Sequence, residues 1–282
     1  ANLSNANLTT ANLRNTNLTR ANLNTAILLF ADLLDATLTE ANLENATLGS
    51  AKLGGADLHK ANLNYAKFGR ANLRGADLSE ASMVVAKLRF ANLSYANLSQ
   101  VNLEGADIAG AKMDWSHLDE ANLENANLSN ANLSDCLLFG ANLRGATLVG
   151  TNLNRANLTG VNLVSAVLVN ADLSDSELTG AGMSFANFGG AKLENANLHR
   201  TVLSVANFAG ADLTNATLSQ AYLYKAILTT ANLSNANLER ADLTEANLTG
   251  ADLSYANLTD TIITETTLLE DANLTGTYLA TQ

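Results

Sequence analysis

Proline is absent from all 282 residues of this chain, and cysteine occurs only once. A chain without proline keeps a backbone N–H at every peptide bond, which suits a fold that uses these groups in hydrogen-bonded ladders. A single cysteine excludes an internal disulfide. We interpret Cys136 as a small buried side chain, because a reactive thiol would need exposure and a lowered pKa.

Long apolar runs are also missing. No stretch approaches the ~18 consecutive apolar residues of a membrane-spanning helix, and the nearest, AILLFADLL at 26–34, contains an aspartate. No signal peptide is visible. We therefore expect a cytoplasmic protein with no membrane span. The chain lacks an initiating methionine and begins inside a repeat, so a repeat domain of a larger protein remains an alternative.

A five-residue repeat fills almost the whole chain. It starts with ANLSN, ANLTT, ANLRN and TNLTR and runs without a slip from Ala1 to Glu270. The third position of each block is apolar and mostly Leu, the first is small and mostly Ala, and neither is ever charged. The third-position exceptions to Leu are Phe68, Met83, Ile108, Met113, Met183, Phe188, Phe208 and Ile263. Two positions of five therefore behave as interior.

A period of five fits neither regular secondary structure. In an α-helix the leucines would spiral around every face, and in a strand an odd period would alternate them between faces. A coil that turns a corner every five residues keeps them inside, with Gly and Asn at the corners. Four such sides close a coil of about 20 residues, and stacked coils pair at about 4.8 Å.

The pattern A(N/D)LXX, as in ANLSN, ADLSE and ANLRG, resembles the pentapeptide-repeat family, which is common in cyanobacteria. The resemblance implies an all-β fold, a right-handed quadrilateral β-helix, here of about 14 coils. It also implies that the first and third residues of each block point inward. The resemblance is specific for the fold and says little about function, because a fold does not name an activity.

The repeat also suggests the domain organisation. We expect a continuous β-helix over residues 1–260. Residues 261–282 form a last coil and a partial C-terminal cap, with a one-residue break in the repeat phase at Asp271.

The sequence contains no recognisable catalytic pattern. His59, His117 and His199 fall on one side of the coil but several coils apart, too far for shared metal ligation. Asp114, Asp119 and Glu120 lie near His117 and are interpreted as a solvated charge cluster, with a weak cation site as the alternative. No serine has a triad arrangement, and no phosphate loop, CxxC or HExxH motif occurs. We predict a protein that is not an enzyme and has no cofactor or metal site.

The four sides differ in charge and in outward apolar residues. Side one begins at residue 1, and sides two, three and four begin at residues 6, 11 and 16. Side two has few acidic residues and a positive balance, whereas sides three and four carry most of the acids of a chain with net charge −11. Large apolar residues at outward positions concentrate on sides one and two, and a contiguous apolar patch indicates an interface. The protein-binding candidates are Val164, Val167, Val169, Phe185, Val202, Val205, Tyr222, Tyr224 and Ile227, and in a second cluster Val85 and Phe90.

These features favour a non-enzymatic protein-interaction scaffold whose apolar sides bind another protein or a second copy of the chain. We expect the residues from Val164 to Ile227 to stack into one surface. The alternative explanation for these outward apolar residues is that branched and aromatic side chains favour stacked β ladders, without any role in binding. The family resemblance implies another function, an acidic DNA mimic that binds and protects DNA gyrase. Direct nucleic-acid binding is disfavoured by the net negative charge.

Overall fold

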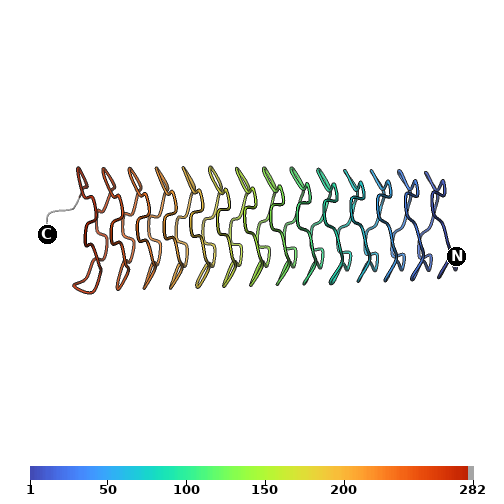
Figure 1. Cartoon of the computed structure of the whole chain (residues 1–282), viewed down its shortest axis with the longest axis horizontal. Coiled ribbons are helices and arrows are strands. Elements are labelled where there is room, and N and C mark those ends of the chain that lie inside the picture. The colour runs from blue at the N-terminus through green and yellow to red at the C-terminus, as the bar shows by residue number, and fades with distance from the viewer. Residues whose placement is uncertain (279–282) are drawn as a thin grey trace. The chain divides into compact units, whose positions relative to one another are not determined.

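The computed structural model describes residues 1–278 and divides into two compact units, Ala1–Asn142 (unit 1) and Leu143–Gln282 (unit 2). Within each unit the backbone winds in successive coils that lie side by side (Figure 1). Among residues 1–278 the backbone pairs through isolated parallel bridges, and neither a longer strand nor a helix occurs.

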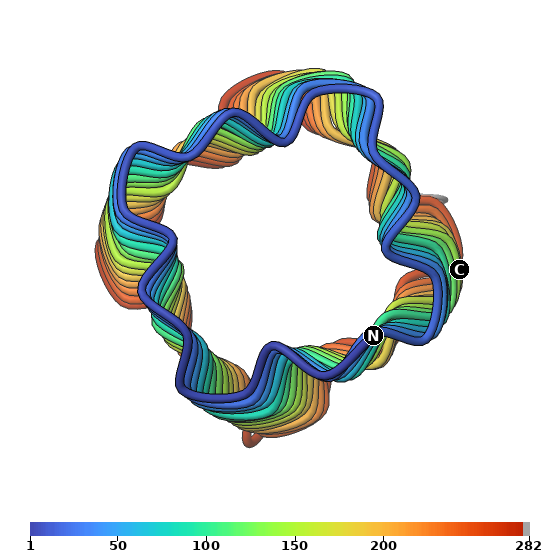
Figure 2. The ribbon, with the colours of Figure 1, turned by 90° about the vertical axis from the view of Figure 1, so that its right-hand side faces the viewer.

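From Asn2 to the bridge between Asp242 and Ile262, each bridge joins the second residue of one block to the residue twenty positions later. In unit 1, Asn2 pairs with Asn22 and Asn22 with Asn42, and in unit 2, Gly182 pairs with Val202. An offset of twenty residues means that four five-residue blocks form one turn of the coil. Viewed along the coils, the blue and green turns of unit 1 trace a four-sided, wavy outline whose corners project outward (Figure 2).

The corner of each block is a tight turn closed by one hydrogen bond. The Ala6 N–H donates to the Leu3 carbonyl at 3.1 Å, and Asn5 between them has a φ of 58°. A positive φ at the third residue of a four-residue turn is the signature of a type II turn, which favours Gly or Asn. Gly and Asn recur at the fifth position for this reason, although the chain also places bulkier residues there.

The remaining backbone N–H groups of a block also have hydrogen-bond partners. One of these partners is the side chain of the second residue, which explains why Asn or Asp is common there. Leu3 N–H donates to Asn22 O at 2.7 Å, Asn5 N–H donates to Asn24 O at 3.0 Å, and Asn22 N–H donates to Ala1 O at 2.8 Å. The fourth-position N–H faces no backbone acceptor, and the second-position side chain supplies one: Ser4 N–H donates to Asn2 Oδ1 at 3.1 Å. With Asn or Asp at position two, every donor of a block is satisfied.

The core consists of the first and third residues, as the sequence predicts. Leu33 and Ala46 are typical in being fully buried, and Phe188 and Phe208 occupy the same interior position as Leu in adjacent coils. Where Thr or Ser replaces Ala, the hydroxyl bonds locally: Thr201 Oγ1 donates to Leu198 O at 2.8 Å. Among the described residues no buried side-chain nitrogen or oxygen lacks a partner.

The phase break lies earlier than the sequence phase suggests. Ile262 still pairs with Asp242 at an offset of twenty, but Leu268 pairs with Asn247 at an offset of twenty-one. The turn bond runs from Thr267 N–H to Thr264 O, so Ile263 is the extra residue, and it is exposed. Placing the break at Asp271 and Ile263 in the interior was therefore wrong. A buried threonine replaces alanine at position 267, and Asp271 takes an ordinary corner position.

Candidate functional site

Unit 2 brings five of the candidate residues together on side one. These residues, Phe185, Val202, Val205, Tyr222 and Tyr224, form what we call the unit 2 patch. Val202 and Tyr222 are bridged partners in adjacent coils, and Phe185 and Val205 occupy the same corner position of adjacent coils. Phe185 is 61% exposed and Tyr222 is 42% exposed, although they lie among backbone that is fully hydrogen-bonded. The patch is therefore an apolar surface on rigid coils.

Charged and aromatic groups border this patch at Tyr224. The rings of Tyr222 and Tyr224 stack with centroids 6.1 Å apart. The Tyr224 hydroxyl donates to Glu245 Oε1 at 3.1 Å, and the Lys225 ammonium lies 4.9 Å from the Tyr224 ring centre. Lys225 Nζ also lies 3.2 Å from Glu245 Oε2. The contacts with Tyr224 and then Glu245 raise the pKa of Lys225, so its charge is held at the rim of the patch.

The other four unit 2 candidates do not join this patch into one surface. Val167 and Ile227 occupy the same column, but Asn187 and Asn207 stand between them and are hydrogen-bonded to each other at 3.2 Å. On side one, two serines separate Val164 from Tyr224 in their column. On side two, a glycine and an alanine follow Val169 in its column. The apolar surface expected to run unbroken from Val164 to Ile227 is therefore divided by polar and small residues.

A second group lies on sides one and two of unit 1, over two adjacent coils. We call it the basic–aromatic patch. Lys67 and Lys87 are bridged partners, and Asp107 follows in the same column. Arg89 Nη1 lies 3.4 Å from Asp107 Oδ2, and the Arg89 guanidinium carbon lies 5.7 Å from the Phe90 ring centre. The members of the patch are Tyr65, Lys67, Arg70, Val85, Lys87, Arg89 and Phe90.

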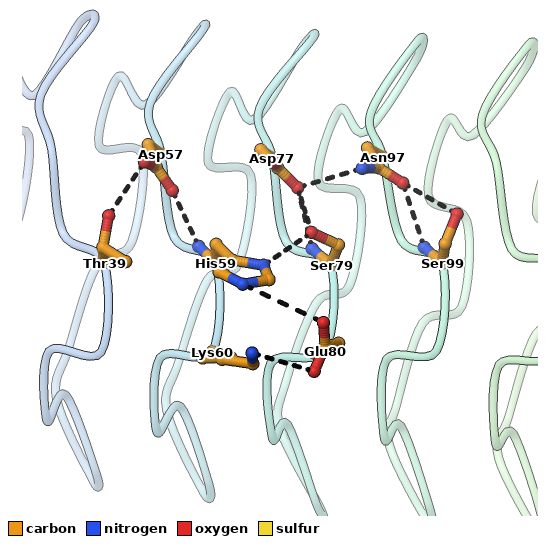
Figure 3. Close-up of polar contacts among 9 residues, drawn as sticks. All are labelled: Thr39, Asp57, His59, Lys60, Asp77, Ser79, Glu80, Asn97 and Ser99. Atoms are coloured by element: carbon orange, nitrogen blue, oxygen red, sulfur yellow. Dashed lines mark hydrogen bonds and ion pairs between the residues drawn. The ribbon is translucent and has the colours of Figure 1, made fainter.

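Side four of unit 1 contains a polar network around His59 (Figure 3). His59 Nδ1 lies 2.9 Å from Ser79 Oγ, and Ser79 Oγ donates to Asp77 Oδ1 at 2.6 Å. Asn97 Nδ2 donates to the same oxygen at 3.1 Å, and Glu80 Oε1 lies 3.9 Å from His59 Nε2. Because the serine proton is bonded to Asp77, His59 Nδ1 is the donor toward Ser79. The arrangement does not present a serine hydroxyl to a histidine base, which nucleophilic catalysis requires.

This network was missed in the sequence, although it had a signal there. His199 Nδ1 lies 2.8 Å from Ser219 Oγ, so the pair repeats in unit 2. In both cases the serine follows the histidine by twenty residues, one full coil. The third histidine, His117, occupies a different position of its block and is exposed. The three histidines thus have separate surroundings.

The acidic residues near His117 are each bonded to a different neighbour. Ser94 Oγ donates to Asp114 at 2.7 Å, and Phe139 N–H donates to Asp119 at 3.2 Å. Among residues 1–278 no group of three His, Cys, Asp or Glu side chains is arranged to hold a metal ion. The same part of the chain contains no helix that is long and apolar enough to span a membrane.

Cys136 is fully buried at a first position, in contact with a serine of the adjacent coil. Its Sγ lies 3.3 Å from Ser116 Oγ and donates to Met113 O at 2.8 Å. Burial raises the pKa of the thiol to about 11, against the opposing hydrogen bond from Ser116. The interpretation of Cys136 as a buried structural residue agrees with this environment.

Comparison with known protein families identifies one family that matches this chain. The model of pentapeptide repeats matches eight times, over residues 1–40, 41–80, 81–119, 116–155, 156–195, 183–220, 191–229 and 226–265. No curated protein sequence matches the chain.

Several solved structures are similar. HetL, a pentapeptide repeat protein involved in heterocyst differentiation regulation from the cyanobacterium Nostoc sp. strain PCC 7120, is 36% identical over 76% of this chain and 88% of its own, with a TM-score of 0.29. Rfr23 from the cyanobacterium Cyanothece 51142 is 37% identical over 36% of this chain and 59% of its own, with a TM-score of 0.20. QnrB1, a plasmid-mediated fluoroquinolone resistance protein, is 18% identical over 72% of this chain and 90% of its own, with a TM-score of 0.40. With family repeats matched from residue 1 to residue 265 and four blocks in every turn of the coil, this chain belongs to the pentapeptide-repeat family.

Proposed function

We propose that this chain is a non-enzymatic protein-interaction scaffold that presents apolar surface on adjacent sides of a right-handed quadrilateral β-helix of about 14 coils. The observation that carries this proposal is the unit 2 patch, where Phe185, Val202, Val205 and Tyr222 are all exposed within three consecutive coils. A surface on hydrogen-bonded coils is ordered before it binds, so association loses little conformational entropy.

Backbone geometry supports binding over simple ladder packing. Phe185 and Val205 stand at corner positions with φ of 61° and 59°, where Gly and Asn are favoured. A β-branched residue with positive φ is a strained outlier, and such strain is a reason to look for a function. Folding alone would favour Asn or Gly at position 205, as at many other corners of this chain.

The remaining candidates in this region, Val164, Val167, Val169 and Ile227, are interrupted in their columns by polar and small residues, and we propose them as separate secondary contacts beside the unit 2 patch. The division into a repeat over 1–260 and a partial cap over 261–282 stays a prediction. Residues 279–282 of that cap lie outside the described part of the chain.

The acidic sides give less support to a DNA mimic that protects gyrase. Their carboxylates are interspersed with cations that pair with them: Arg14 with Asp32 at 3.2 Å and Arg20 with Glu40 at 2.8 Å. Lys60 and Glu80 pair in the same way at 3.3 Å. A surface in which acid and base alternate does not reproduce the uniform negative charge of a DNA backbone.

The proposal is tested by disrupting the patch without disturbing the fold. We would capture partners from a lysate of the source cells with the intact chain and with a Phe185→Lys/Tyr222→Lys variant, and measure self-association of both by analytical ultracentrifugation. Each introduced lysine places a charge in the centre of the apolar surface, so a specific partner, or a second copy, should be lost from the variant.

The matched control is Tyr255→Lys. Tyr255 is also an exposed aromatic corner residue of unit 2, with a φ of 59°, but it lies on side three. Binding that survives Tyr255→Lys and is abolished by the double variant supports the patch. Equal binding by all three proteins would show that these aromatic residues only pack within the ladder.

A further inference from the structure

The cations of side two are confined to one place. All four lysines and arginines of this side, Lys67, Arg70, Lys87 and Arg89, lie in two adjacent coils of unit 1. Lys67, Lys87, Arg89 and Arg70 are all exposed. Such a concentration of positive charge on a chain with net charge −11 sets this patch apart from the other sides.

The stacking of Lys67 on Lys87 is unfavourable for the fold itself. These two residues are directly bridged, and like charges that face each other across a ladder destabilise it. On side three the lysines avoid this arrangement, because Lys52 is bridged to Asn72 and Lys112 to Asn92. The bridge of Lys87 to Asp107 offsets part of this cost, but the other bridged partner of Lys67 is the uncharged Thr47, so the fold gives no reason for a lysine at position 67.

Among the described residues, most of these charges also lack carboxylate partners. Within residues 1–278, neither lysine of the pair nor Arg70 forms an ion pair, and the carboxylate that continues their column, Asp107, is already paired with Arg89. An uncompensated cluster of cations attracts an anionic group from outside the molecule.

Apolar groups flank the cations in a fixed position. The Phe90 ring lies over Gly110 of the next coil so closely that a Cβ on that glycine would be 2.5 Å from the ring. The Arg89 guanidinium carbon lies 5.7 Å from the centre of this ring, yet Phe90 remains 56% exposed. Across the corner, Tyr65 is exposed and Val85 is half-buried. Lys67, Lys87 and Arg89 thus lie between two corners that carry apolar side chains, and Arg70 occupies the same corner column as Phe90.

We propose that the basic–aromatic patch binds an acidic segment of a partner protein, one that carries apolar side chains among its carboxylates. The carboxylates pair with Lys67, Lys87 and Arg70, and the apolar side chains pack on Phe90 or on Tyr65. This inference rests on the protein-binding function proposed above and names the chemistry of one partner. A nucleic acid fits less well, because a polyanion longer than two coils, about 10 Å, meets the acidic residues of a chain with net charge −11.

The test measures binding of a short fluorescein-labelled peptide in which Glu alternates with Phe and Leu, by fluorescence anisotropy. The variant Lys67→Glu/Lys87→Glu should weaken binding by at least about tenfold, because two attractive charges become repulsive. The control Lys52→Glu/Lys112→Glu makes the same change of net charge on side three and should leave the affinity within about twofold. Raising the salt concentration should weaken binding of the intact chain.

Three results would overturn the inference: no binding of the peptide, equal loss in both double variants, or tighter binding of a short single-stranded DNA than of the peptide. Thermal unfolding distinguishes a structural role of Lys67 and Lys87 from a role in binding. Lys67→Gln/Lys87→Gln should unfold at the same or a higher temperature, because it relieves the repulsion, while still losing peptide affinity. The Phe185→Lys/Tyr222→Lys variant should bind the peptide normally, so failure of the unit 2 surface and failure of this patch give different results.

Discussion

The rings of Phe188 and Phe208 stack face to face inside unit 2, with centroids 4.6 Å apart and planes within 1° of parallel. Both side chains are fully buried at third positions of adjacent coils, where most blocks have leucine. The interior of a coil thus accepts a flat ring, and two rings in adjacent coils can stack because the coil spacing of about 4.8 Å is close to the separation of stacked rings.

We expect Phe188→Ala to lower the free energy of unfolding by about 3–5 kcal/mol, since it removes a buried ring and leaves a cavity beside Phe208. Phe185→Ala, three residues earlier but 61% exposed, should change it by less than about 0.5 kcal/mol. Urea unfolding followed by circular dichroism measures both. Similar losses for the two variants would contradict the assignment of inward and outward positions.

Val205→Asn should stabilise the protein by about 1 kcal/mol, because asparagine tolerates a φ of 59° better than a β-branched residue does. The same variant should weaken binding of a partner that uses the unit 2 patch. Thermal unfolding and partner capture, measured on the same protein, check both parts. A destabilised variant would show that Val205 is held in place by packing rather than retained for binding.

Gly110→Ala and Gly160→Ala separate backbone strain from crowding. The φ of Gly110 is 67° and that of Gly160 is 66°, so each substitution by alanine introduces a backbone strain of about 1 kcal/mol. A Cβ at Gly160 meets nothing within 4 Å, whereas one at Gly110 meets the Phe90 ring. Gly110→Ala should therefore displace that ring and weaken binding of the acidic peptide, and Gly160→Ala should not. Anisotropy and thermal unfolding of the two variants provide the comparison.

Cys136 should react slowly with a thiol reagent in the folded protein, because burial raises the pKa of its thiol to about 11. Reaction with Ellman's reagent should become fast in denaturant. Cys136→Ala should fold normally, since alanine is the usual residue at this position. Fast labelling of the native chain at neutral pH would contradict a closed interior at this coil.

The pKa of Glu40 lies below its ordinary value, because the Arg20 guanidinium donates hydrogen bonds to the carboxylate and lies close to it. A lowered pKa means that the ion pair contributes stability above the unfolded pKa, and this contribution is lost as the pH falls through the folded pKa. Arg20→Gln should raise the pKa of Glu40 and reduce the loss of stability in acid. Carboxyl NMR titration reads the shift directly, and an unchanged Glu40 titration in the variant would refute the pairing.

Much of the fold follows from the sequence because its two interior positions are strict. A leucine such as Leu33 and an alanine such as Ala46 reveal the inward positions by their spacing alone. The sequence could not locate the extra residue, because Ile263 keeps the apolar character of a third position although it lies outside. Apolar character alone does not fix the phase of a repeat when the next block offers Thr267 as a small buried residue.

The sequence could assign the candidate site to a side of the coil, but it could not define the extent of the apolar surface. Counting in twenties places Tyr222 above Val202 correctly. It also places Asn187 and Asn207 between Val167 and Ile227, a separation that is overlooked when only the outward apolar residues of a side are counted. Contacts such as that of Phe90 with Gly110 depend on side-chain rotamers, which the repeat pattern leaves undetermined.

The twenty-residue offset between bridged residues limits how such a chain can evolve in length. Within a unit, an insertion of one five-residue block would keep every leucine inside, yet it would turn all later residues by a quarter of a circle. A block inserted between Lys67 and Lys87, for example, would place these two bridged residues on different sides. Only gains or losses of whole turns preserve both the interior and the surfaces, so we expect length variants among relatives to differ by multiples of twenty residues.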